Sequence, residues 1–229
     1  MILKLVVVSP KYQNNLGYIA RVASNFGIKK LHIVAPRAKI TGKDAIMYSK
    51  HAHSLIERAS IYKNLEDALE GCDIAIGTTG IWEKARAGFR GVSLPDELEK
   101  RLQKAAFRNT NVALVIGRDD TGLSKEEMEL CNILAYIPTS PSYPVLNVSH
   151  ALAILLFFLT RTELGKNYRI DPSEKPDKKE ILTLYKMLGL LMADKKIREK
   201  ETVKRIFVRL LSLAQPTKKE VHALITALK

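Results

Sequence analysis

The sequence predicts an α/β fold built on a mostly parallel β-sheet. Five apolar runs, each bounded by glycine, proline or polar residues, occur at residues 3–8, 31–35, 74–77, 112–116 and 133–137. Apolar residues at consecutive rather than alternating positions are typical of strands buried on both faces. Helical patterns fill the intervals, and alternating strands and helices indicate a parallel sheet with helices on both sides.

Six helices are expected between and after these strands. They fall at residues 17–26, 44–59, 65–69, 95–106, 124–130 and 149–164. Ser124 and Glu127 have the spacing of a capping box, and Ser93 shortly before Pro95 indicates another helix start. The last of these helices is strongly apolar, so we expect it to pack against the sheet or against another subunit.

The composition changes after this helix. Residues 166–179 carry many charges and two prolines, which predicts a linker. Apolar residues then recur every three or four positions in three segments, residues 180–192, 198–213 and 217–228, the last opened by a Thr217/Glu220 capping box. The predicted organisation is an α/β domain at 1–165, a linker at 166–179 and a helical extension at 180–229.

The charge of the chain points to a polyanionic partner. Lys and Arg number 37 against 24 Asp and Glu, a net charge of +13. Residues 166–229 hold 16 basic and 8 acidic side chains, so this quarter of the chain carries +8 of the excess. Seven basic residues lie within fifteen positions there: Lys195, Lys196, Arg198, Lys200, Lys204, Arg205 and Arg209. We interpret this extension as an RNA-contacting surface, although charged helix faces also serve simply as solvated surface.

Several classes of protein are set aside by composition. Cys72 and Cys131 are 59 positions apart without a CxxC or Cys/His cluster, so we expect reduced thiols in a cytoplasmic protein and no metal site. The longest apolar run has nine residues, whereas a membrane span needs about 20, so no membrane association is expected. No GxGxxG follows the first strand, which argues against a dinucleotide-binding domain.

Three loops that follow predicted strands are candidates for a ligand site. The first enters a helix with Asn15 and Arg21, the second begins at Gly117, and the third covers residues 137–149 with three prolines. Open α/β sheets gather ligands at the carboxyl ends of their strands. Structural alternatives exist for the first two loops, because asparagine also caps helices and glycine also suits a turn that needs positive φ.

Sequence motifs in these loops resemble those of one enzyme family. The stretches are NNLGYIARVASNFGIKKLHIVAP, IGTTG, ALVIGRDDTGLSKEEMELC and IPTSPSYPVLNVSHALAIL. In order and spacing they resemble the motifs of the SPOUT RNA methyltransferases, in particular the TrmH/TrmJ branch, over about two thirds of the chain. The resemblance implies a sheet that ends in a trefoil knot, a homodimer with a site shared between subunits, and S-adenosylmethionine as methyl donor.

The resemblance also implies which residues form the site. It assigns cofactor binding to Thr78, Thr79, Gly80, Gly117, Ile137, Val145, Leu146 and Asn147, and catalysis to Arg21, Asn15, Asn147 and Asp119. Two positions depart from the family pattern, since many relatives have Ser in place of Val145 and Glu in place of Asp119. A guanidinium stays protonated in proteins, so we interpret Arg21 as a clamp on the RNA phosphate next to the target ribose.

The expected activity is S-adenosylmethionine-dependent 2'-O-methylation of a ribose in tRNA. The PxYPVLN stretch and the helical extension favour the TrmJ side and nucleotide 32 of the anticodon loop. RNA contacts are expected from Arg21, Lys195, Lys196, Arg198 and Arg205. Two alternatives stay open: a ribosomal RNA 2'-O-methyltransferase of the same family, and a non-catalytic knotted RNA-binding protein.

Overall fold

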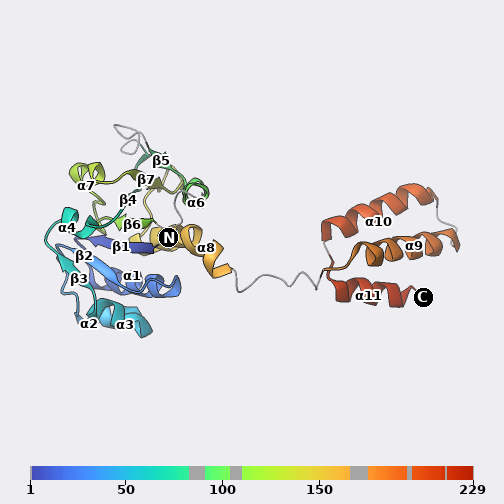
Figure 1. Cartoon of the computed structure of the whole chain (residues 1–229), viewed down its shortest axis with the longest axis horizontal. Coiled ribbons are helices and arrows are strands. Elements are labelled where there is room, and N and C mark those ends of the chain that lie inside the picture. Colours follow the sequence, from blue (N-terminus) through green and yellow to red (C-terminus); the bar gives the residue numbers. More distant parts are fainter. Residues whose placement is uncertain are drawn as a thin grey trace. The chain divides into compact units, whose positions relative to one another are not determined.

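The chain divides into two compact units in the computed structural model (Figure 1). They comprise residues Met1–Lys166 and Asn167–Lys229. The structure describes residues 2–82, 91–103, 110–165, 175–194, 198–214 and 216–228. The two units are considered separately below.

The first unit contains a seven-stranded sheet in which every pairing is parallel. Its order is β3-β2-β1-β6-β4-β7-β5. The strands are β1 (Ile2–Val8), β2 (Leu31–Val34), β3 (Ser60–Tyr62), β4 (Ile74–Thr79), β5 (Val92–Ser93), β6 (Asn111–Ile116) and β7 (Ile133–Tyr136). The predicted parallel sheet is thus confirmed, with two short strands, β3 and β5, that the sequence analysis missed.

The continuous apolar runs arise because the sheet separates two hydrophobic cores. Neighbouring residues of a strand point to opposite faces. In β1, Leu5 and Val7 belong to one core, while Val6 and Val8 belong to the other. The same division holds along β6, so Leu5–Val8 of β1 and Val112–Ile116 of β6 are buried on both faces and are all apolar.

Helices cover both faces of the sheet (Figure 1). One face packs against α1 (Gln13–Asn25), α2 (Lys43–Ser49), α3 (His53–Glu57), α6 (Pro95–Leu102) and α8 (Val148–Leu164). The other packs against the shorter helices α4 (Leu65–Leu69) and α7 (Lys125–Glu129). Helix α7 begins with the predicted capping box, in which Ser124 accepts from the Glu127 backbone and Glu127 accepts from the Ser124 backbone.

Three predicted helices differ from the structure. The helix expected at 17–26 is α1, which begins at Gln13, so Asn15 lies inside it and the N-cap residue is Tyr12. The helix expected at 44–59 is interrupted after α2, because Lys50 has a φ of 52° and starts a 3-10 turn, Lys50–Ala52, ahead of α3. The helix expected at 95–106 is α6, which ends at Leu102; residues 104–109 lie outside the described residues. Ser93 does not cap it, since Ser93 lies in β5 and Leu94 donates its backbone N–H to Glu97 at 3.0 Å.

The second unit consists of α9 (Lys178–Asp194), α10 (Lys200–Ala214) and α11 (Lys218–Ala227). Its buried residues include Leu184, Met192 and Val221. Thr217 and Glu220 form the predicted capping box of α11. Helix α10 has no buried residue, and its apolar side chains, among them Phe207 and Leu213, are exposed. Of the predicted linker, residues 166–174 lie outside the described residues.

Two further observations concern the described part of the chain. Its helices include none that is both long and apolar enough to span a membrane. Both cysteines are free thiols. Cys131 is buried, and burial followed by the nearby charge of Glu127 raises its pKa to about 12, so this thiol stays protonated at neutral pH.

Candidate active site

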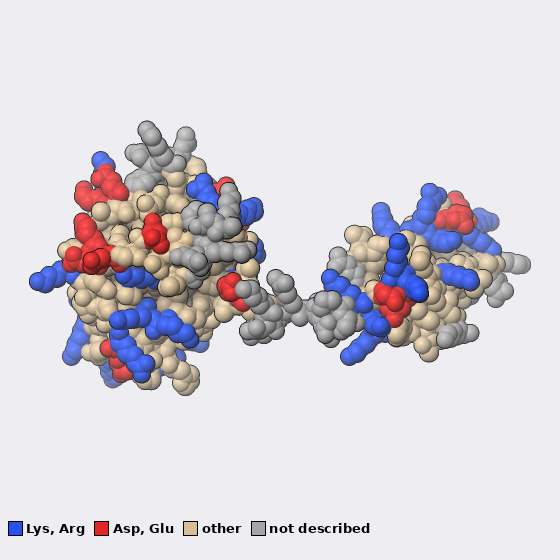
Figure 2. All heavy atoms as spheres, viewed as in Figure 1, with Lys and Arg blue, Asp and Glu red and all other residues tan. Residues whose placement is uncertain are grey.

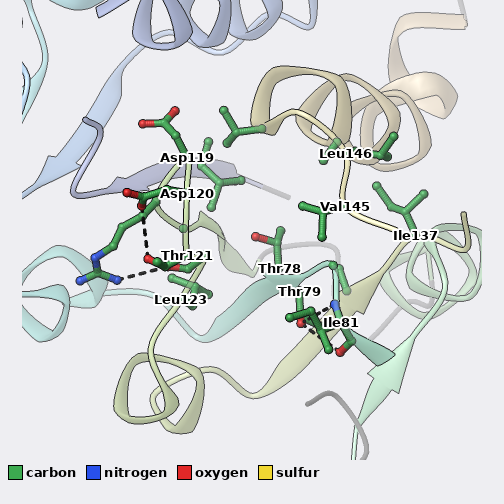
Figure 3. Close-up of a pocket in the computed structure, with 18 of the residues that line it drawn as sticks. Thr78, Thr79, Ile81, Asp119, Asp120, Thr121, Leu123, Ile137, Val145 and Leu146 are labelled. Atoms are coloured by element: carbon green, nitrogen blue, oxygen red, sulfur yellow. Dashed lines mark hydrogen bonds between the residues drawn. The ribbon is translucent and has the colours of Figure 1, made fainter. Parts of the chain in front are cut away.

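A cavity opens at the carboxyl ends of β4, β6 and β7, where open α/β sheets bind their ligands. Thr78, Ile137 and Val145 approach it from three different segments (Figure 3). Seven of the eight residues expected at the cofactor line this cavity: Thr78, Thr79, Gly80, Gly117, Ile137, Val145 and Leu146. Asn147, the eighth, is not among the lining residues but directly follows Leu146.

The loop after β6 needs glycine for steric reasons. A Cβ on Gly117 would lie 2.3 Å from both the Gly122 carbonyl carbon and the Leu123 nitrogen. The chain folds back here, since Arg118 and Gly122 exchange backbone hydrogen bonds of 3.2 and 3.1 Å. Gly122, rather than Gly117, has the positive φ, 71°. A positive φ is therefore not the reason for glycine at Gly117; the close approach of the Gly122 and Leu123 backbone is.

A partly buried ion pair fixes this loop to α7. Both terminal nitrogens of Arg118 donate to the Glu127 carboxylate at 2.7 and 2.8 Å, and one of them also reaches the Gly122 carbonyl. Burial by itself would raise the pKa of Glu127, but the hydrogen bonds from Arg118 and the Ser124 backbone outweigh it and lower that pKa. A planar two-point contact of this kind orients the loop as well as holding it.

The loop between β7 and α8 is held by its own hydrogen bonds. Thr139 donates its hydroxyl to the Pro144 carbonyl at 2.6 Å, and the Tyr143 N–H donates to the Ser140 carbonyl at 3.0 Å. Val145 and Leu146 follow this turn and line the cavity. A segment that is fixed by prolines and internal bonds keeps its main-chain groups in place for a ligand.

Three of the predicted catalytic residues form one hydrogen-bonded chain. Asn147 donates its side-chain N–H to Oδ1 of Asn15 at 3.1 Å, and Asn15 donates its own to Oδ1 of Asp119 at 2.8 Å. Asn15 lies in α1 after β1, and Asp119 lies in the loop after β6. Strand β1 lies between β2 and β6, so the direction of the strand order reverses there. The three hydrogen-bonded side chains lie at this point of the sheet.

The side chains of Asn15, Asp119 and Asn147 use only part of their hydrogen-bonding groups within this hydrogen-bonded chain. Asp119 also accepts the Lys11 and Tyr12 backbone N–H groups at 2.8 and 3.3 Å. Asn147 accepts the N–H and hydroxyl of Ser149. An amide side chain has two N–H donors. Asn15 and Asn147 therefore each retain one donor for an oxygen atom of a ligand.

The structure does not bring Arg21 to the cavity. Arg21 is exposed on α1, and its side chain makes no hydrogen bond or ion pair with the part of the chain that the structure describes. Six positions separate it from Asn15, so the two side chains leave the helix about 120° apart. Arg21 thus presents an unpaired guanidinium to solvent.

The basic residues expected to bind RNA lie in the second unit. Arg198 and Arg205 are exposed, whereas Lys195 and Lys196 lie outside the described residues. On the visible face of this unit, Lys and Arg side chains cover much more area than Asp and Glu (Figure 2). Among the described residues no group of three or more His, Cys, Asp or Glu side chains is arranged to hold a metal ion.

The sequence analysis missed two supports of the site. Ser149 orients Asn147, and the Asn-x-Ser spacing at the start of α8 is a cap signal that could have revealed it. Lys11 pairs with Asp120 at 2.9 Å, and its backbone N–H binds Asp119. That pair lowers the pKa of Asp120 through the Lys11 hydrogen bond. No local pattern links these two, because 109 residues separate them.

Comparison with known proteins identifies the family. Residues 2–157 match the SpoU rRNA Methylase family. The chain is 34% identical over 236 residues to the tRNA (cytidine-2'-O-)-methyltransferase TrmJ of Methanocaldococcus jannaschii, covering 100% of this chain and 99% of that protein. A second TrmJ, from Sulfolobus acidocaldarius, is 35% identical over 167 residues, 72% of this chain and 68% of that protein.

The solved structures agree in fold. TrmJ from Z. mobilis ZM4 superposes with a TM-score of 0.67 at 21% identity, covering 100% of this chain and 98% of that chain. The chain therefore belongs to the SpoU methylase family, in the TrmH/TrmJ branch of the SPOUT RNA methyltransferases.

Proposed function

We propose that the protein transfers a methyl group from S-adenosylmethionine to a ribose 2'-hydroxyl of tRNA. One observation carries this proposal: the Asn147–Asn15–Asp119 chain, with unused N–H donors, stands beside a cavity lined by seven of the residues that the family uses for its methyl donor. Family membership and the tRNA substrate in the names of the TrmJ relatives support the same activity.

The lining of the cavity fits S-adenosylmethionine. Apolar side chains such as Ile116, Ile137 and Leu155 suit an adenine ring, while the hydroxyls of Thr78 and Thr79 suit polar groups. Gly80 leaves room beside Val145, whose methyl carbons lie 3.6 Å from the position of a Cβ on Gly80. Bound there, the donor supplies a methyl group on a positively charged sulfur. The chain contributes main-chain contacts and exclusion of water.

The acceptor ribose belongs next to the two asparagines. The free N–H groups of Asn15 and Asn147 orient an oxygen of the target nucleotide, and Asp119 holds Asn15 in position. Arg21 binds the neighbouring phosphate with its guanidinium and so aligns the hydroxyl. The hydroxyl proton leaves to the phosphate or to water, since neither amide can accept it.

We propose that the protein works as a homodimer in which Arg21 of one subunit serves the site of the other. Arg21 points to solvent in its own subunit, which supports a role across an interface. Helix α8 supplies an apolar stripe for that interface: Phe157 is 47% exposed and Leu164 is 40% exposed. Isologous contacts of this kind bring each subunit to the other's site.

The remaining parts of the proposal concern the substrate and the chain topology. Residues 1–165 form the methyltransferase domain, and Arg198 and Arg205 of the basic extension contact tRNA phosphates. Lys178 and Lys179, the last residues of the linker predicted at 166–179, belong to α9 and so to the extension predicted at 180–229. We propose nucleotide 32 of the anticodon loop as the target, on the resemblance of the PxYPVLN stretch and the helical extension to the TrmJ side. The segment around β6 and β7 forms the trefoil knot of the family, which the position of β4 between these two strands supports.

The experiment also tests ribosomal RNA as a substrate, because the name of the matching family includes ribosomal RNA. Purified protein is incubated with methyl-labelled S-adenosylmethionine and, separately, unmodified tRNA and unmodified ribosomal RNA. We expect label in tRNA, at a ribose whose 3' phosphodiester resists alkaline cleavage. Label in ribosomal RNA alone would favour the second substrate, and label in neither RNA would contradict methyltransferase activity.

A further inference from the structure

Trp82 and Tyr136 form an aromatic pair beside the cavity. Their ring centroids are 5.0 Å apart and the ring planes are inclined by 50°. Trp82 follows β4 closely, and Tyr136 ends β7, where its backbone is in register with Thr79 of β4. The pair is thus built on two adjacent strands of the sheet rather than on a free loop.

The pair lies at the rim of the cavity in the sense that it is one residue away from the lining along the chain and not inside the cavity. Neither ring lines the cavity, whereas Ile81, Ala135 and Ile137, their neighbours in sequence, do. Thr79 further holds this rim, because its hydroxyl exchanges hydrogen bonds of 3.3 Å with the backbone of Ile81. A ligand on the pair would therefore lie within one residue of the cavity lining along both segments.

Trp82 keeps a large part of its surface free. The side chain is 40% exposed although tryptophan is one of the largest apolar residues. Rings inclined by 50° do not stack face to face, so Tyr136 supports the indole without covering both of its faces. An exposed, supported aromatic face is the element that single-stranded nucleic-acid-binding proteins use for stacking on bases.

We propose that Trp82, supported by Tyr136, stacks on an unpaired base of the RNA that flanks the methylated nucleotide. This inference rests on the proposed function, which brings RNA to the rim. Stacking tolerates any base, so the pair contributes affinity for a looped, single-stranded region rather than for one sequence. The net charge of +13 supports a nucleic acid as occupant.

Fluorescence tests the contact directly, because Trp82 is the one tryptophan of the chain. The full-length protein is titrated with unmodified tRNA, with an isolated anticodon stem-loop, and with S-adenosylhomocysteine alone. We expect both RNAs to quench the emission of Trp82 and S-adenosylhomocysteine to leave it nearly unchanged. Quenching by S-adenosylhomocysteine alone would assign Trp82 to the donor pocket and overturn the proposal.

Variants test whether the contact contributes to catalysis. Trp82→Leu is expected to raise the KM for tRNA about tenfold with kcat nearly unchanged, since base stacking contributes on the order of 1–3 kcal/mol. Trp82→Phe keeps an aromatic face and is expected to lose much less. Ile61→Ala removes a side chain that is 52% exposed on β3, far along the sheet order, and serves as the matched control.

The outcomes separate this inference from the proposed function. If the wild type methylates tRNA and Trp82→Leu leaves its KM unchanged, the stacking proposal is wrong and the proposed function stands. If the wild type methylates no RNA, the proposed function itself fails. A Trp82→Leu protein that binds S-adenosylhomocysteine normally but requires more tRNA supports both.

Discussion

Asn15 donates its side-chain N–H to Asp119 at 2.8 Å, although 104 residues separate them in the chain. This bond joins the helix after β1 to the loop after β6. Asn147 then connects α8 to the same point. Three segments that are remote in sequence thus place one pair of free amide donors.

Breaking the Asn147–Asn15–Asp119 hydrogen bonds is expected to slow methyl transfer without weakening the binding of the methyl donor. Asn15→Ala removes the hydrogen bonds that Asn15 makes with Asp119 and with Asn147. Displacement of reacting groups by about 1 Å costs on the order of a hundredfold in rate. We expect kcat/KM to fall by that factor. Calorimetric titration with S-adenosylhomocysteine should give an affinity close to that of the wild type, because Asn15 does not line the cavity.

The neighbouring residue provides the control for that variant. Asn14 is the same residue type, is exposed, and its side chain makes no hydrogen bond with the part of the chain that is described. Asn14→Ala should therefore methylate tRNA at nearly the wild-type rate. Equal losses in Asn14→Ala and Asn15→Ala would show that the hydrogen-bonded chain has no special role.

Arg21 is expected to act across the subunit boundary. Arg21→Ala and Asn147→Ala should each be inactive, but a mixture refolded together should recover about a quarter of the wild-type activity, because half of the dimers then contain one intact site. The measurement is methyl incorporation into tRNA by the mixture. Recovery near zero, with dimers present in sedimentation, would place Arg21 in the site of its own subunit.

Gly117 is expected to be indispensable to the cavity. A methyl group there would meet backbone atoms at 2.3 Å, and forcing such a contact costs about 1–3 kcal/mol of unfolding free energy. We expect Gly117→Ala to lower the midpoint of thermal unfolding and to weaken S-adenosylhomocysteine binding.

Gly165→Ala provides the comparison for Gly117→Ala. No atom lies within 4 Å of a Cβ placed on Gly165, so this variant should behave as the wild type in both measurements. If Gly117→Ala unfolded at the same temperature as Gly165→Ala and bound S-adenosylhomocysteine as tightly, the close approach of Gly122 would not require glycine at position 117.

His32 is expected to make stability depend on pH. Burial, together with the charges of Lys4 and Lys30, lowers its pKa from an ordinary 6.5 to about 4. Between these values the unfolded chain binds the proton and the folded chain does not, so the free energy of unfolding falls as the pH is lowered through this range.

Urea unfolding at about pH 7.5 and about pH 5 measures this loss. His32→Gln has no proton to take up and should lose less stability between the two pH values than the wild type. An identical loss in the two proteins would assign the pH dependence to other groups.

Contacts of the second unit with phosphates are expected to appear in the salt dependence of tRNA binding. Replacing Arg198 and Arg205 together by Ala should flatten the slope of log affinity against log salt by about 2, about one for each phosphate contact. The double Lys variant keeps both charges and should retain the slope. A slope equal to the wild type in the double Ala variant would show that these side chains do not contact RNA.

The sequence predicted the central sheet well, because buried strands leave an unbroken apolar run such as residues 112–116. It missed β3, whose three residues include the exposed Ile61 at the sheet edge, and β5, which has two residues. The interruption at Lys50 was also invisible, since a positive φ in a lysine is imposed by tertiary structure and not by its own preference.

The site was predictable to the extent that motifs mark it. Motif residues that follow β4, β6 and β7 line one cavity, whereas those of the loop after β1 do not. The bond between Asn15 and Asp119 depends on strand order, which local patterns do not determine. Trp82 and Tyr136 lie 54 positions apart and carry no motif, so only the structure brings them together.

The central claim is that the cavity at the carboxyl ends of β4, β6 and β7 holds the methyl donor beside Asn15 and Asn147. A crystal structure of the protein with S-adenosylhomocysteine tests it most directly. The account predicts the compound against Thr78, Gly117 and Val145, with its sulfur directed toward the two asparagines. Density for the compound at any other place, with this cavity empty, would contradict the account.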